Sequence, residues 1–118
     1  MSAAIAQSAG VAARRLAVAA AMTALASFSA QADDLMQQGK KLFLSGAMPA
    51  CAVCHTLADA GSAGEIGPVL DELKPDAARV EKAVRNGLGI MPANKNLTDE
   101  QIRLLAQYVA TASGGVKR

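Results

Sequence analysis

Residues 51–55 read Cys-Ala-Val-Cys-His, and the rest of the chain can be interpreted around this stretch. Two thiols separated by two residues can each add to one of the two vinyl groups of a single haem. The histidine directly after the second cysteine is then held beneath the iron. The spacing is therefore typical of a c-type haem attachment site, with Cys51 and Cys54 as covalent attachment points and His55 as an axial ligand.

Other interpretations of the two cysteines explain less of the pattern. A redox dithiol of the thioredoxin type needs a βαβ context and does not need the histidine. A structural zinc site needs four Cys or His ligands, whereas the chain contains two Cys and one His. A disulfide between residues three apart would close a very short loop and stabilise little, because the entropic gain grows with loop length.

The first third of the chain has the composition of a targeting segment. Arg14 and Arg15 supply positive charge, and residues 16–30 form an alanine-rich apolar run. A membrane span needs about 20 predominantly apolar residues, and this run is shorter and is interrupted by Thr23 and Ser27. The run is therefore typical of a secretory signal peptide rather than a retained anchor.

The end of this segment carries a small-x-small cleavage pattern, Ala-Gln-Ala, at residues 30–32. We therefore predict a signal peptide at residues 1–32 and a mature domain at residues 33–118, without stable membrane insertion of the mature chain. Covalently bound haem is fitted to an unfolded chain after export. We accordingly expect general secretion to the periplasm rather than the twin-arginine route.

The charge of the chain argues against nucleic acid as a partner. The full sequence has 12 Lys and Arg against 10 Asp and Glu. Arg14 and Arg15 belong to the predicted signal peptide, so the mature chain has equal numbers of basic and acidic side chains. A nucleic-acid-binding domain typically has a clustered basic patch, and the sequence shows none.

A first helix is expected just before the cysteines. Asp33 or Asp34 can cap its N-terminus, and the helix should end near residues 45–46. Its apolar face has the i, i+4, i+7, i+8 spacing of Leu35, Gly39, Leu42 and Phe43. Glycine inside a helix costs about 1 kcal/mol relative to alanine. Gly39 is therefore expected to mark the close approach of another helix, a merely tolerated glycine being the alternative.

Two further helices are expected after the cysteines. The first opens at Pro75-Asp76 and closes at Asn86-Gly87 in an αL conformation, with an apolar side made by Val80, Ala83 and Val84. Thr98 and Gln101 form a capping box for a last helix that ends at residues 114–115. Its apolar face comprises Ile102, Leu105, Ala106 and Val109, flanked by Leu104 and Tyr108.

The segment at residues 57–67 is rich in Asp, Gly and Ser and indicates an irregular loop. No segment shows the alternation of a strand. The mature domain is therefore expected to be all-α.

Two residues between these helices are candidates for positions beside a haem. Pro68 has no N–H and a carbonyl free to accept, and a haem-ligating histidine commonly donates its second ring nitrogen to a backbone carbonyl. Pro68 is therefore the candidate acceptor for His55, an ordinary turn proline being the alternative. Met91 lies in a Gly/Pro-rich segment without helical periodicity. A thioether is a soft ligand suited to haem iron, so Met91 is the candidate sixth ligand, with simple packing as the alternative.

With these motifs in place, the mature chain resembles the class I cytochromes c along nearly its whole length. Members of that family share a Gly and a Phe in the first helix, a Gly-Pro turn, a Met loop and an aromatic residue in the last helix. These features match Gly39 and Phe43, residues 67–68, residues 91–92, and Leu105 with Tyr108.

The resemblance implies a class I cytochrome c fold with three to four helices around one haem c, bound covalently through Cys51 and Cys54. It implies that the first and last helices cross at Gly39, and that Asn94 donates to the sulfur of the methionine ligand. The cofactor-binding set is thus Cys51, Cys54, His55, Pro68, Met91 and Asn94. Many family members bind a haem propionate through a Trp, and this chain has no Trp. The propionate partners are therefore unassigned.

A narrower resemblance concerns the segments at residues 51–57, 67–80 and 84–87. They are similar to the cytochrome subunits that accept electrons from bacterial molybdenum sulfite dehydrogenases. The resemblance implies a periplasmic one-electron carrier, not an enzyme, that receives electrons from a sulfite-oxidising molybdoenzyme and passes them to a downstream cytochrome or oxidase. His/Met ligation would leave no open iron position and would raise the potential.

Two alternatives remain open at this point. The first is a haem enzyme or gas sensor with an open distal site, which would usually need a polar distal group such as Asn94 or Asn96. The second is a general cytochrome c carrier that feeds a terminal oxidase.

Overall fold

The computed structural model describes residues 27–116. The chain divides into two compact units, residues 1–33 and 34–118. In the first unit, the described residues 27–33 are helical and exposed. Arg14, Arg15 and most of the predicted signal peptide lie outside the described residues, so the domain boundary at residues 32–33 stays a prediction. Among the described residues, no helix has both the length and the apolar character needed to cross a membrane.

The first helix of the domain continues into a π-helical turn. Residues 27–41 are α-helical, and η1 (Leu42–Gly46) follows them. The predicted end near residues 45–46 is confirmed. The predicted cap at Asp33 or Asp34 is wrong, because helical residues begin before either one. The Asp34 carboxylate instead accepts a hydrogen bond from Gln38 Nε2 one turn later, at 2.7 Å. Leu35 is half exposed and lies outside the core.

The region after η1 is more regular than the sequence suggests. Two single-turn helices, α2 (Cys51–Cys54) and α3 (Leu70–Leu73), enclose a small antiparallel hairpin of β1 (Thr56–Leu57) and β2 (Ser62–Ala63). The prediction of an irregular loop at residues 57–67 is therefore wrong in part. Strands of two residues are too short to show the period-two alternation that identifies a strand in a sequence.

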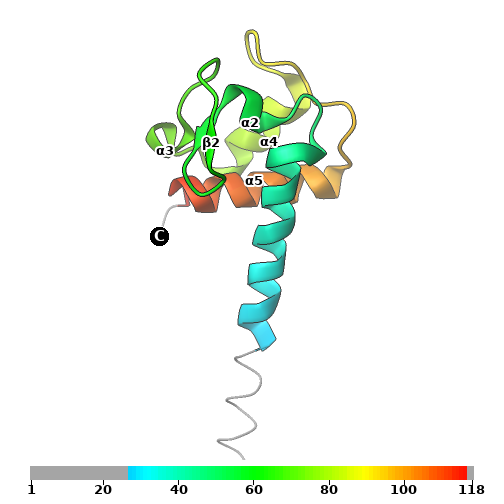
Figure 1. The fold of residues 1–118 in the computed structure, drawn as a ribbon. Coiled ribbons are helices and arrows are strands. Elements are labelled where there is room, and N and C mark those ends of the chain that lie inside the picture. The colour runs from blue at the N-terminus through cyan, green and yellow to red at the C-terminus, as the bar shows by residue number, and fades with distance from the viewer. Residues whose placement is uncertain (1–26, 117–118) are drawn as a thin grey trace, which may run out of the picture. The chain divides into compact units, whose positions relative to one another are not determined.

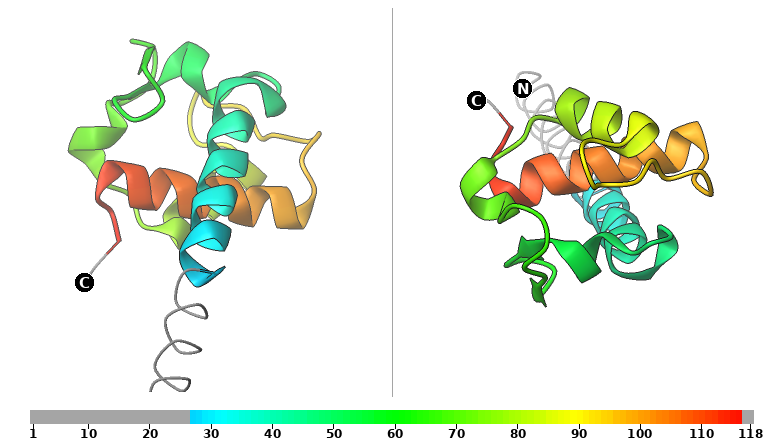
Figure 2. Two further views of the ribbon diagram at one scale, coloured as in Figure 1. Left: turned by 60° about the horizontal axis from the view of Figure 1, so that its bottom comes forward. Right: turned by 90° about the horizontal axis from the view of Figure 1, so that it is seen from above.

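Two further helices, α4 (Ala77–Asn86) and α5 (Asp99–Ser113), pack against each other (Figure 2). Asp76 caps α4 by accepting from the Arg79 N–H at 2.8 Å. Gly87 ends α4 with φ 74° and ψ 169°. The predicted αL closure is therefore wrong, although the positive φ still favours glycine.

The boundaries of α5 agree with the prediction. Thr98 and Gln101 form the capping box through reciprocal side-chain and backbone hydrogen bonds. Gly114 ends the helix in the αL conformation, with φ 80° and ψ 19°. The expected fold class is also confirmed, since the domain is mostly helical and its one sheet among the described residues is the small hairpin.

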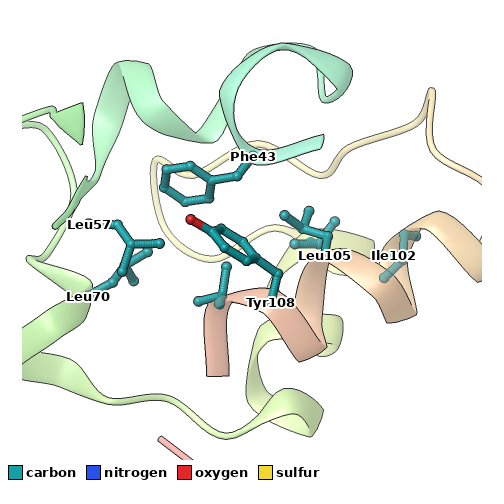
Figure 3. Packing of buried hydrophobic residues seen from close by; sticks show 8 residues of the cluster. Phe43, Leu57, Leu70, Ile102, Leu105 and Tyr108 are labelled. Carbon is teal, nitrogen blue, oxygen red and sulfur yellow. The ribbon is translucent and has the colours of Figure 1, made fainter. Parts of the chain in front are cut away.

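The hydrophobic core lies between the first helix, the hairpin and α5 (Figure 3). Phe43 and Tyr108 pack edge to face, with ring centroids 6.1 Å apart and an interplanar angle of 62°. Around them lie Leu57, Leu70, Val84, Ile102, Leu105 and Val109. Tyr108 is fully buried, so it belongs to the core rather than to the flank of α5 that the sequence indicated.

The first helix crosses α5 (Figure 1), and the contacts of Gly39 with Tyr108 and Leu104 place it at this crossing. A Cβ atom on Gly39 would overlap Tyr108 Cβ and would lie 2.9 Å from the Leu104 carbonyl oxygen. Only a residue without a side chain allows this approach. The predicted crossing is confirmed, and its contacts are Tyr108 and the Leu104 backbone rather than Leu105.

We expect Gly39→Val to separate the two helices and to lower the free energy of unfolding by about 1–3 kcal/mol, because the site has no room for added atoms. Denaturant unfolding followed by circular dichroism measures the change. Gly61→Asn is the control, since nothing lies within 4 Å of a Cβ there and Asn tolerates the positive φ. Equal stability of Gly39→Val and wild type would contradict the tight crossing.

Candidate haem-binding site

One cavity of about 530 Å³ lies between α2, α4, α5 and the loop at residues 87–97. This volume is within the usual range for ligand sites of about 300–1,000 Å³, and the lining is mostly apolar. The structure brings all six sequence-predicted site residues to its wall: Cys51, Cys54, His55, Pro68, Met91 and Asn94.

The two cysteines begin and end the single turn of α2. His55 is the residue that ends this helix, and its N–H donates to the Cys51 carbonyl at 3.0 Å. Both cysteines are free thiols that line the cavity. Burial, and to a lesser degree the neighbouring Cys54, raise the pKa of Cys51 to about 11. The Cys51 thiol of the unmodified chain is therefore protonated at neutral pH.

The imidazole of His55 is held on one side by backbone. Its Nδ1 lies 2.9 Å from the carbonyl oxygen of Pro68, which is the hydrogen bond expected from the sequence. Since that carbonyl can only accept, the neutral ring carries its proton on Nδ1 and leaves the lone pair of Nε2 available. The Gly67 N–H donates to the Cys54 carbonyl at 2.7 Å and closes this turn back onto α2.

Gly67 lies directly against the histidine ring. A Cβ on Gly67 would be 2.7 Å from His55 Nδ1 and 2.9 Å from Nε2. Any side chain at this position would therefore push the ring away from the Pro68 carbonyl. The Gly-Pro pair thus has two separate tasks, since the glycine makes room for the ring and the proline carbonyl orients it.

Met91 is half-buried in the loop after α4 and packs against the hydrophobic core. Leu88 and Met91 exchange two backbone hydrogen bonds of 3.0 Å, which form a tight turn. The turn packs on Gly87, where a Cβ would lie 2.8 Å from the Met91 carbonyl oxygen. The backbone around Met91 is therefore well defined.

Asn94 follows Met91 and ties the loop back to α4. Its N–H donates to the Val84 carbonyl at 2.8 Å. Its side-chain Oδ1 is buried and has no hydrogen-bond partner among the described residues. A buried amide oxygen without a partner normally indicates a group that pairs with something else at the site.

The loop at residues 87–97, here called the methionine loop, connects α4 to α5. An ion pair joins these two helices beside the loop. Arg85, in the last turn of α4, pairs with Asp99 at the start of α5 and lies 3.7 Å from Glu81. The hydrogen bond from Arg85, together with its positive charge, lowers the pKa of the Asp99 carboxyl. This exposed pair connects the helices from which the loop leaves and to which it returns.

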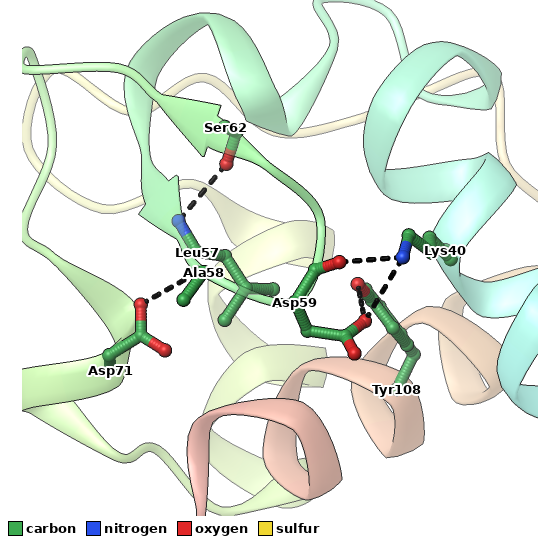
Figure 4. Close-up of polar contacts among 7 residues, drawn as sticks. All are labelled: Lys40, Leu57, Ala58, Asp59, Ser62, Asp71 and Tyr108. Carbon is green, nitrogen blue, oxygen red and sulfur yellow. Dashed lines mark hydrogen bonds and ion pairs between the residues drawn. The ribbon is translucent and has the colours of Figure 1, made fainter.

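The hairpin after His55 is held by polar side chains, one of its own and one from α3, that the sequence did not single out (Figure 4). Ser62 Oγ donates to the His55 carbonyl at 2.9 Å and accepts from the Leu57 N–H at 3.0 Å. Asp71 accepts from the Ala58 N–H at 2.9 Å. Ser and Asp in turns often form hydrogen bonds with nearby backbone groups. Their presence in this region therefore indicated such bonds, but the sequence could not identify the partners.

A second polar cluster connects this hairpin to the helix crossing (Figure 4). The Tyr108 hydroxyl donates to the Asp59 carboxylate at 2.6 Å. Lys40, adjacent to Gly39, donates to the Asp59 carbonyl at 2.6 Å and lies 3.5 Å from its carboxylate. The segment that carries His55 is therefore attached both to the first helix and to α5.

These observations test whether the residues present suit a covalently bound haem. The cavity is mostly apolar, two free thiols lie on its wall, and one imidazole nitrogen has an available lone pair. A thioether lines the same cavity. Imidazole and thioether together are a known axial pair for haem iron. The donor set and the lining therefore fit a haem c.

Comparison with known proteins agrees with this geometry. Residues 34–109 match the family described as cytochrome C oxidase, cbb3-type, subunit III. The chain is also similar to a solved structure, the crystal structure of the c-type cytochrome SorU from Sinorhizobium meliloti, with 56% sequence identity and a TM-score of 0.68. The similarity covers 73% of this chain and 99% of that chain. No curated protein sequence matches the chain significantly.

Tyr108 should make the stability of the domain depend on pH in the alkaline range. Burial, and then the hydrogen bond to Asp59, raise its pKa above the ordinary value. The neutral phenol is thus favoured by folding, so its contribution is complete below about pH 10, the pKa of the unfolded chain, and is lost as pH rises further. We expect Tyr108→Phe to cost about 1 kcal/mol at pH 7 and to show a shallower loss above pH 10.

Denaturant unfolding of both proteins between pH 7 and 11 checks this expectation. The chain has one Tyr, so the difference between the two curves isolates this phenol from the lysines, which titrate in both proteins. Parallel curves for wild type and Tyr108→Phe would contradict the proposed role of the hydroxyl.

Proposed function

The chain belongs to the cytochrome c family, whose members are electron carriers with covalently bound haem c, and we propose that it carries electrons from a sulfite-oxidising molybdenum enzyme to a downstream cytochrome or oxidase in the periplasm. The expected haem c cofactor is confirmed by this membership. The observation that carries the proposal is the cavity that holds both His55, oriented by Pro68, and Met91.

We assign the site residues as follows. Cys51 and Cys54 would form the two thioether bonds to the haem, and His55 and Met91 would hold the iron through Nε2 and sulfur. The Pro68 carbonyl holds the His55 proton on Nδ1. The side-chain amide of Asn94 would donate a hydrogen bond to the sulfur of Met91. A bound haem supplies one-electron oxidation and reduction, at a potential that His/Met ligation raises.

The residues around the cavity favour a carrier over a haem enzyme or gas sensor with an open distal site. Such a site usually needs a polar distal group, for which Asn94 and Asn96 were the candidates. The Asn96 amide is engaged by the backbone at Gly46 and Met48, whereas the Asn94 side chain has an Oδ1 with no partner in the described part of the chain and lines the same cavity as Met91. Met91 itself lines the cavity. We therefore propose that His55 and Met91 both hold the iron, which would leave no open position for a substrate.

The sulfite-oxidising partner rests on the narrower sequence resemblance. The segments at residues 51–57, 67–80 and 84–87 are similar to cytochrome subunits that accept electrons from sulfite dehydrogenases. In the structure these three segments contribute residues to one cavity. We further propose that residues 1–32 are a signal peptide, that residues 33–118 are the mature domain and that general secretion exports it to the periplasm.

Exposed apolar side chains near the cavity provide a surface for electron-transfer partners. Val53 is 62% exposed and Ile90 is 85% exposed, and their neighbours Cys54 and Met91 line the cavity. The mature chain has equal numbers of acidic and basic side chains, so long-range steering is weak. We propose that docking relies on this apolar patch, made of Ala50, Ala52, Val53, Ile90, Pro92 and Ala93, with Lys95 as a charge at its rim.

The ligand assignment predicts a spectroscopic change in Met91→Ala. The variant should lose the weak far-red absorption band that sulfur ligation gives to oxidised haem, should become high-spin or water-ligated, and should have a lower potential. Visible spectra and a redox titration of the holoprotein measure both effects. Met48→Ala is the control, since Met48 is 72% exposed. An unchanged band and potential in Met91→Ala would remove Met91 as the ligand.

The docking proposal predicts the kinetics of reduction by a sulfite-oxidising molybdenum enzyme. Stopped-flow rates should change only modestly between low and physiological salt, because screening acts mainly on separated exposed charges. Val53→Glu should slow reduction more than Lys95→Ala does. A steep salt dependence, or sensitivity to Lys95 alone, would indicate an electrostatic docking site. Absence of any reduction would favour the general carrier that feeds a terminal oxidase.

A further inference from the structure

We propose that Asn96 is a positioning residue that holds the loop carrying Met91 against the chain segment that leads into Cys51. Asn96 donates from Nδ2 to the Gly46 carbonyl at 3.1 Å and accepts at Oδ1 from the Met48 N–H, also at 3.1 Å. One side chain thus bonds to two backbone groups about fifty residues away in the sequence. The proposal rests on the proposed role of Met91 as an iron ligand.

The chemistry of these two bonds requires an asparagine amide in one orientation. The Gly46 carbonyl can only accept, and the Met48 N–H can only donate. The amide therefore has to present its NH₂ to Gly46 and its oxygen to Met48. A carboxylate could still accept from Met48 but could not donate to Gly46, so Asp is not equivalent to Asn at this position.

The segment to which Asn96 bonds is itself fixed by burial and by a backbone hydrogen bond. Ala47, between the two bonded residues, is 2% exposed, and its N–H donates to the Leu42 carbonyl at 3.0 Å. Immediately afterwards, the chain at Pro49, Ala50 and Cys51 lines the cavity. Asn96 therefore connects the methionine loop to a fixed part of the wall beside the first cysteine.

The remaining hydrogen bonds of the methionine loop are either internal to the loop or go to α4. The pair between Leu88 and Met91 is internal to the loop, and the Asn94 N–H bonds to Val84 in α4. Among residues 27–116, the two bonds of Asn96 are the only hydrogen bonds from loop 87–97 to a segment outside α4. Without these two bonds, the part of the loop near Gly46 and Met48 is held by packing, including that of the half-buried Leu97 against the core.

A loop that opens more often exposes the iron more often to an external ligand. The apparent affinity of such a ligand is proportional to the fraction of molecules in the open state. Both bonds are exposed to solvent, so each contributes toward the lower part of its usual range, and losing both increases that fraction by roughly 10-fold. The expected effect is on the retention of Met91, because the bonds around His55 and Pro68 do not involve Asn96.

Imidazole titration of the oxidised holoprotein tests the proposal, with loss of the far-red band as the measure of methionine displacement. Asn96→Ala should bind imidazole roughly 10-fold more tightly than wild type, and Asn96→Asp should fall between them because it keeps one bond. Gln107→Ala, which removes an exposed carboxamide from α5, is the matched control and should bind imidazole as wild type does. Thermal unfolding followed by far-UV circular dichroism reports the global stability of each variant.

Imidazole affinity of Asn96→Ala equal to that of wild type would overturn the proposal, whatever the change in melting temperature. So would equal tightening in Asn96→Ala and Gln107→Ala. Failure of the ligand assignment is seen separately, because wild type would then lack the far-red band and Met91→Ala would bind imidazole with the wild-type affinity.

Discussion

The close crossing of the first helix and α5 at Gly39 is the contact on which the rest of the domain depends. Because Gly39 has no side chain, Tyr108 lies directly beneath the first helix. There its hydroxyl reaches Asp59 in the hairpin, and Lys40 reaches the same residue from the first helix. The hairpin in turn holds the His55 backbone through Ser62. The helix crossing at Gly39 is thus connected, through these hydrogen bonds, to the backbone of His55 at the cavity.

The two sides of the cavity are held by different physical means. Around His55, short-range backbone bonds and the absence of a Gly67 side chain define the ring position within a segment of about a dozen residues. Around Met91, the loop is long and has few internal bonds, so it depends on α4 and on Asn96 for its position. If Met91 binds the iron as proposed, it is the ligand expected to dissociate first, since local opening follows the regions with the fewest contacts.

The electron-carrier function is consistent with the apolar lining of the cavity as well as with the donor groups on its wall. An electron carrier needs two stable ligands, a dry pocket and an exposed edge, and it needs no acid, base or nucleophile. The mostly apolar wall of the cavity suits such a pocket, and Val53 and Ile90 are exposed beside residues that line it. The family match over residues 34–109 and the 56% identity to a c-type cytochrome agree with this account.

The sequence by itself determined the features that depend on local spacing: the Cys-x-x-Cys-His motif, the capping box at Thr98, the Gly114 stop and the Gly-Pro turn beside His55. It indicated that Gly39 would meet another helix, since a helical glycine has a cost that packing must offset. Only the tertiary structure decided that the first helix is already formed before Asp33 and Asp34, the conformation of Gly87, the two-residue strands, and the partners of Asp59, Ser62 and Asn96. These depend on groups distant in the sequence, or on elements too short for any periodicity, so no local pattern could specify them.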